Sequence, residues 1–135
     1  DDARGKSLLQ RLSQTATSKT DHHHNINDNT TIKTIPNTNT ATYLALLNNQ
    51  SDLLTAIADM DIFTHTPIPS KEALRHAKLL VLDANPPLPS LVTAASNAHD
   101  VNVDVLLEPT SVPKIKELVK QPEFMAMITY TTPNK

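Results

Sequence analysis

Glycine is almost absent from this chain, which has a single one, Gly5, in 135 residues. Loops that cradle a phosphate need several glycines, because glycine lets backbone N–H groups come close to the anion. The sequence therefore excludes a Walker-type or dinucleotide-binding loop within these residues. Cysteine is absent altogether, which excludes a disulfide framework and a thiolate metal site and suits a reducing compartment.

Strong charge of either sign and long apolar runs are lacking as well. The formal net charge is -2, with 39% hydrophobic and 19% charged residues, which is typical of a globular domain. No basic patch with interleaved aromatic residues is present, and no apolar run approaches the ~20 residues of a membrane span. We therefore expect no nucleic-acid partner, no membrane partner and an intracellular, first of all cytoplasmic, location; mitochondria and peroxisomes stay open.

Both ends of the sequence look cut. Asp1 opens it without a methionine, and Lys135 follows almost directly on a strand-like segment. The length suffices for one domain at most. We therefore expect residues 1–135 to be a partial domain of a longer protein.

Two successive strand-to-helix units in residues 78–114 predict a parallel sheet. The apolar run Leu79–Leu82 and the segment Val101–Leu107 each end in polar residues and a proline, and a helix is expected after each. Phe124–Tyr130 predicts a third parallel strand. Ligands of open α/β sheets bind beyond the carboxyl ends of the strands. The polar side chains placed there are Asp83, Asn85, Glu108, Thr110 and Ser111, and either Thr110 or Ser111 can cap the following helix.

The part before this core predicts a hairpin and a loop. Residues 6–14 have the spacing of a short amphipathic helix, and residues 17–39 have the Asn- and Thr-rich composition of a mobile loop. Strands over 40–47 and 53–60 form a hairpin, and a loop at Phe63–Pro69 leads to a helix over 71–77 that Ser70 caps. The expected parts are thus a hairpin at about 40–60 and an α/β core at about 70–135.

Six stretches, in this order and spacing, resemble the ribokinase-like (PfkB-type) carbohydrate kinases, and most closely their pseudouridine kinase branch. These stretches are Asp1–Leu9, Thr40–Leu47, Ala56–Ile62, Leu82–Asn85, Glu108–Lys114 and Thr132–Asn134. They cover nearly the whole chain apart from the Asn- and Thr-rich loop. The resemblance implies an α/β ribokinase-like partial domain, with a parallel sheet flanked by helices and the hairpin as its lid.

The resemblance also implies a function for the parent protein. It would be an ATP-dependent kinase that phosphorylates the 5-hydroxyl of pseudouridine or a similar nucleoside or sugar, with ATP and Mg²⁺ as cofactors. Asn85 falls where the family places a polar side chain near the sugar, and Asp83, Thr110 and Ser111 join it as substrate-side candidates. Asn134 matches the first residue of the family's Asn-x-x-Glu motif, which organises magnesium and phosphate. Relatives in eukaryotes are often fused to a glycosidase domain, which is a possible partner here.

Two departures from the family pattern limit this expectation. The glycine-rich sugar-binding segment and the Gly-Ala-Gly-Asp motif are missing; the motif supplies the catalytic aspartate and an anion hole. We therefore expect no catalytic residue in this chain, no bound cofactor and no activity of the chain alone. The alternative is a non-catalytic binding or dimerisation module, because lid hairpins of this family can pair between subunits.

Several polar residues have simpler interpretations. His22–His24 point in different directions and have no second cluster of ligands, so no metal site is expected. Asp83 and Asn85 could equally form a turn before Pro86. Asp59 and Asp61 resemble a pair of carboxylates, but an exposed lid edge explains them more simply.

Overall fold

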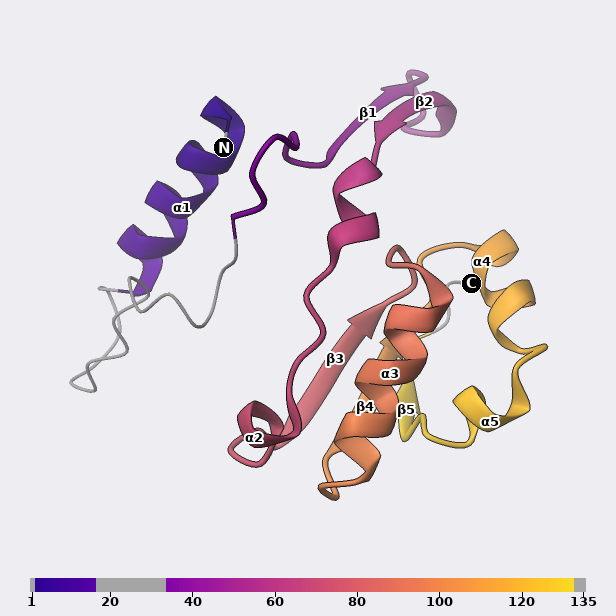
Figure 1. Ribbon diagram of the computed structural model, residues 1–135. Helices are drawn as coiled ribbons and strands as arrows, with labels where there is room; N and C mark the ends of the chain where they lie inside the picture. Colours follow the sequence, from indigo (N-terminus) through magenta and orange to yellow (C-terminus); the bar gives the residue numbers. More distant parts are fainter. Residues whose placement is uncertain (1, 17–33, 133–135) are drawn as a thin grey trace. The chain divides into compact units, whose positions relative to one another are not determined.

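A computed structural model describes residues 2–16 and 34–132 of the chain (Figure 1). The chain divides into two compact units, Asp1–His65 and Thr66–Lys135. Asn134, His22–His24 and most of the expected loop at 17–39 lie outside the described residues. No helix in the described part is long and apolar enough to cross a membrane.

The first unit begins with helix α1, Ala3–Ala16, which is longer than the expected 6–14. Asp2 precedes it, and its Oδ1 accepts a hydrogen bond of 2.8 Å from the Gly5 N–H. A carboxylate in this place satisfies a backbone donor that the first helical turn leaves without a partner. The helix therefore starts three residues earlier than its apolar spacing alone suggests.

The predicted hairpin is present in the same unit. Strands β1, Thr42–Leu47, and β2, Leu53–Asp59, pair antiparallel, with Thr42 opposite Asp59. In the connecting turn, the Asn48 side-chain oxygen accepts from the backbone N–H groups of Gln50 at 2.9 Å and Asp52 at 2.8 Å. Ser51 has φ of 67°, in the left-handed region that glycine adopts most readily. Side-chain bonds of Asn48 thus hold the turn without a glycine.

The hairpin has no core of its own. Among the described residues of this unit, none is buried. Large apolar side chains more than half exposed lie along both strands: Tyr43, Leu44, Leu46, Leu47, Leu53, Leu54 and Ile57. After β2, residues Asp61–His65 form a 3₁₀-helix, η1, which takes up the first three residues of the loop expected at Phe63–Pro69. The Thr64 hydroxyl donates to the Asp61 carbonyl at 2.7 Å and supports this turn.

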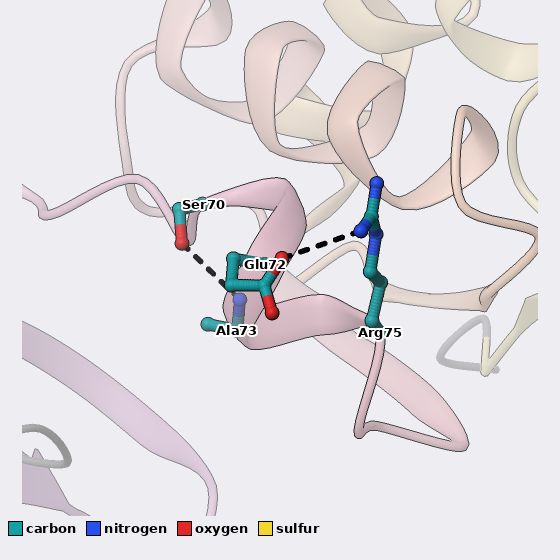
Figure 2. Close-up of polar contacts among 4 residues, drawn as sticks. All are labelled: Ser70, Glu72, Ala73 and Arg75. Carbon is teal, nitrogen blue, oxygen red and sulfur yellow. Dashed lines mark hydrogen bonds and ion pairs between the residues drawn. The ribbon is translucent and has the colours of Figure 1, made fainter.

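The second unit opens with helix α2, Lys71–Leu74, which is capped as predicted but shorter than 71–77. Figure 2 shows the Ser70 hydroxyl accepting from the Ala73 N–H at 3.2 Å, and an ion pair of 3.4 Å between Glu72 and Arg75. The helix ends after one turn, and the Ala77 N–H bonds back to the Leu74 carbonyl at 2.8 Å. This tight turn leads the chain directly into the sheet.

Three parallel strands in the order β3-β4-β5 form the sheet of this unit. They are β3, Leu79–Asp83, β4, Asp104–Glu108, and β5, Tyr130–Thr131. Helix α3, Leu88–His99, connects β3 to β4. Helices α4, Val112–Leu118, and α5, Pro122–Met125, connect β4 to β5 (Figure 1). The predicted parallel sheet flanked by helices is confirmed.

Two predicted strands are too long. Phe124–Tyr130 is not one strand, because Pro122 opens helix α5 and only Tyr130–Thr131 pairs with β4. Phe124 is 1% exposed and fills the core from this helix. Val101–Val103 precede β4 as a turn, in which Asn102 has φ of 56°. In both places the buried apolar residue belongs to a helix or a turn. The hydrophobic pattern alone does not distinguish such a residue from one in a strand.

The core lies on one face of the sheet. Val105 and Leu107 of the central strand are 1% and 0% exposed, and they pack with α3, whose alanines allow a close approach. Leu91, Leu118 and Phe124 bring α3, α4 and α5 into the same cluster as Leu107. The other face is open, since Val81 is 62% and Tyr130 is 53% exposed.

Candidate functional site

The carboxyl ends of β3 and β4 lie side by side. Asp83 and Glu108 are register partners at the last position of the two strands. Beyond them, the Ala84 N–H donates to the Glu108 carbonyl at 3.0 Å, so the two loops leave the sheet together. The structure thus brings Asp83, Asn85, Glu108, Thr110 and Ser111 to one edge, where the topology of a parallel sheet places ligands.

Asp83 shapes the first of these loops. Its Oδ1 accepts a hydrogen bond of 2.7 Å from the Asn85 N–H, which is the pattern of an Asx turn. Asp83 is exposed, Ala84 is buried and Asn85 is half-buried. The turn-forming interpretation therefore describes Asp83, and this turn holds Asn85 in place.

Asn85 is joined to helix α4 by Lys114. The Lys114 ammonium donates to the Asn85 Oδ1, and both residues are half-buried. Because the Oδ1 of this amide accepts from the ammonium, the Nδ2 group at its other end faces away from Lys114 and can donate to another acceptor. Lys114 was not among the predicted site residues. The feature of the sequence that could have pointed to Lys114 is its position in the first turn of the helix that follows Ser111.

Glu108 is the last residue of β4 and lies at the same edge of the sheet. Its carboxylate accepts from the Thr132 hydroxyl and, at 3.0 Å, from the Thr110 N–H. These two bonds, that from Thr132 first, lower the pKa of Glu108 against the smaller, opposite effect of burial. Thr132 is a second residue that sequence reasoning missed, since its partner lies 24 positions away.

A strained turn separates Glu108 from helix α4. The Ser111 N–H donates to the Pro109 carbonyl at 2.6 Å across Thr110, whose φ is 59°. This is a γ-turn with positive φ, a rare conformation that is unfavourable for a β-branched residue. Ser111 then takes the N-cap position of α4, but its side chain makes no capping hydrogen bond. The bond from the Thr110 N–H to Glu108 helps to hold this strained conformation, and the Thr110 Oγ1 is buried.

The chemistry available at this edge suits a ligand rich in hydroxyl groups. Carboxylate, amide, ammonium and hydroxyl side chains converge there, and together they both donate and accept hydrogen bonds. Within residues 2–16 and 34–132, no group of three His, Asp or Glu side chains could hold a metal ion. Asn134, the residue expected on the cofactor side, lies outside the described residues.

The arrangement of the elements is similar to that of a solved structure. A carbohydrate kinase from Agrobacterium tumefaciens matches with a TM-score of 0.58 and 23% sequence identity. The chain has a carbohydrate kinase-like fold. The match covers 72% of this chain but only 33% of that kinase, so this carbohydrate kinase-like chain spans about a third of its structural neighbour. No family model matches the sequence, and no curated protein matches it significantly.

Proposed function

We propose that this chain is a part of an ATP-dependent carbohydrate kinase that contributes side chains to the sugar site, and that the acceptor is the 5-hydroxyl of pseudouridine or a similar nucleoside. The observation that carries the proposal is the bond between Lys114 and Asn85 at the carboxyl edge of a kinase-like sheet. It orients an amide where ligands of such sheets bind. The six stretches that resemble pseudouridine kinases support the choice of nucleoside.

Each polar side chain of the edge has a task in this proposal. Asn85 donates through Nδ2 to a ribose oxygen, and Lys114 is the positioning residue that holds the amide. Ser111 offers a hydroxyl group from the strained turn, whereas the Thr110 Oγ1 is buried and Thr110 contributes the shape of that turn. Asp83 holds the loop of Asn85. ATP and Mg²⁺ bind with residues beyond the described range, with Asn134 on the cofactor side. A fused glycosidase domain is part of the same proposal for the parent protein.

Calorimetry with pseudouridine tests the assignment of Asn85. The variant Asn85→Ala should weaken binding by about 1 to 3 kcal/mol, because a ribose hydroxyl then loses its partner in a half-buried place. Asn49→Ala, in the exposed hairpin turn, is the matched control and should bind as the unchanged chain does. Equal affinity of the Asn85 variant and the control would remove Asn85 from the site.

A second candidate function is association through the hairpin without catalysis. It is favoured by the exposed apolar side chains of β1 and β2 and by the open edges of a two-stranded sheet. A homodimer that pairs these hairpins is the expected form. Sedimentation of the Leu44→Asp variant distinguishes the candidates: loss of the dimer with unchanged nucleoside affinity supports association as a separate role, whereas a monomeric unchanged chain excludes it.

A further inference from the structure

Glu108 contacts the segments that follow all three strands of the parallel sheet. It is the last residue of β4, the central strand. Its backbone carbonyl accepts a hydrogen bond of 3.0 Å from the Ala84 N–H, which belongs to the loop after β3. Its Oε1 accepts from the Thr110 N–H at 3.0 Å in the loop after β4, and its Oε2 accepts from the hydroxyl of Thr132, the residue after β5. A single residue thus joins segments that are far apart in the sequence.

Thr132 restricts how the Glu108 side chain can turn. An ionised carboxylate only accepts hydrogen bonds, and each of its oxygens here has a donor of its own. The Thr132 N–H also donates to the Leu107 carbonyl at 3.4 Å, so the backbone of Thr132 is bonded to the strand that carries Glu108. With Oε2 bonded to Thr132, Oε1 stays directed at the Thr110 N–H.

The contact with Thr110 has a further effect because it lies directly before helix α4. Thr110 has φ of 59°, and such a strained conformation persists only where the surroundings impose it. The next residue, Ser111, is the N-cap of α4, but its side chain makes no capping hydrogen bond. Lys114, in the first turn of the same helix, donates to the Asn85 Oδ1. The bond to Glu108 therefore helps to determine where α4 begins and whether Lys114 meets Asn85.

We propose that Glu108, held by Thr132, is a positioning residue that keeps the first turn of α4 in the place where Lys114 bonds to Asn85. The inference rests on the proposed function, because the side chains that are arranged in this way are those of the proposed nucleoside site. Glu108 acts through the backbone of Thr110 and the helix, without contact with the nucleoside. A site whose loops are already held in place loses less entropy when a ligand binds, so the nucleoside affinity depends on Glu108.

Calorimetry of the full chain with pseudouridine tests this role. Glu108→Ala removes both side-chain contacts and should weaken binding at least about tenfold, because the loops must then be ordered on binding. Glu108→Gln should bind within about threefold of the unchanged chain, since the amide oxygen can accept from the Thr110 N–H and the amide nitrogen can donate to the Thr132 hydroxyl. Thr132→Val should weaken binding at least about threefold in the unchanged chain but not further in Glu108→Ala, because the two residues act through one contact.

Two matched variants are the controls. Glu117→Ala removes the same charge from the exposed face of α4, where Glu117 pairs with Lys120 at 2.7 Å, and Thr131→Val changes the exposed neighbour of Thr132. Both should bind within about twofold of the unchanged chain, because neither contact reaches the start of α4. Thermal melting selects a temperature at which every variant is folded, and Thr132→Val carries the test if Glu108→Ala does not fold. Without nucleoside, the Thr110 amide should exchange its hydrogen faster in Thr132→Val and Glu108→Ala than in Glu117→Ala.

The possible failures can be told apart. Equal affinity of Glu108→Ala and the unchanged chain, or an equal loss in Glu117→Ala, would remove Glu108 from this role and leave the nucleoside site in place. Binding by Glu108→Gln that is as weak as that of Glu108→Ala would show that the hydrogen bonds do not carry the effect. If the unchanged chain binds no pseudouridine, the proposed site itself is wrong, and the role of Glu108 is overturned with it.

Discussion

Thr110 is the most strained residue at the candidate site, and its strain has a measurable effect on stability. A β-branched residue at φ of 59° is unfavourable, whereas glycine adopts this conformation readily. Thr110→Gly should therefore raise the free energy of unfolding by about 1 kcal/mol, the lower end of the cost of such strain. Urea unfolding provides the measurement. Thr93→Gly, in the exposed face of α3, should instead lower stability by about 1 kcal/mol, and a similar loss at Thr110 would disprove the strain.

Glu108 provides a test of the polar contacts at the same edge. Its folded-state pKa is lowered, first by the Thr132 hydroxyl, from an unfolded value of about 4.3. The stability that it contributes is therefore fully present above the unfolded pKa and is lost as the pH falls through the folded pKa. Thr132→Val should raise the folded pKa toward its ordinary value, as followed by NMR titration of the carboxyl carbon. A pKa that stays in place would show that the Thr132 bond does not form in solution.

At the scale of single elements, the Asp2 carboxylate joins the start of α1 to Thr40, and this close approach depends on Gly5, the only glycine of the chain. Alanine at position 5 would gain about 1 kcal/mol of helix propensity. We expect the clash at 2.8 Å with the Thr40 hydroxyl to outweigh that gain and to separate α1 from Thr40. The pKa of Asp2, which the Gly5 N–H and then the Thr40 N–H lower to about 2, should then rise toward about 3.9.

NMR titration of Asp2 measures this change. In the unchanged chain, the stabilising effect of Asp2 is complete above about pH 4 and is lost as the pH falls toward 2, because the folded pKa is the lower one. Thr40→Ala removes the colliding oxygen, so Gly5→Ala should raise the pKa less in that background than in the unchanged chain. An Asp2 pKa that Gly5→Ala leaves at about 2 would contradict the claim that Gly5 lets Asp2 bond to Thr40.

The elements also show what the sequence could predict. Local signals in the sequence predicted β3, the hairpin and the cap of α2 correctly. For β3, the signal was the apolar run Leu79–Leu82 followed by two prolines. Phe124 was assigned to a strand because a buried residue has the same apolar character in a helix as in a strand. The carboxyl edge was predictable from strand order alone. Lys114 and Thr132 were missed because their roles depend on which loops meet in space.

At the scale of the whole molecule, the chain should not transfer phosphate by itself. Phosphoryl transfer depends on positioning and on electrostatic stabilisation of the moving group, and the sequence contains no Gly-Ala-Gly-Asp stretch, the motif of the kinases that it resembles. With pseudouridine, ATP and Mg²⁺, mass spectrometry should find no 5-phosphate above a protein-free blank.

The exposed Val81 and Tyr130 on the open face of the sheet should also make the isolated chain prone to associate. Turnover by a monomer would contradict both expectations.

The most direct test of the account is to locate where pseudouridine binds. A ¹⁵N-labelled chain titrated with pseudouridine should show amide shift changes at residues 83–85 and 108–114, the two loops beyond β3 and β4, with smaller changes in the Lys114→Gln variant. Uridine, which has the same ribose, reports whether the base contributes. Shift changes confined to the hairpin or to α1, or none at millimolar nucleoside, would contradict the claim that the carboxyl edge of this sheet is a sugar-binding site.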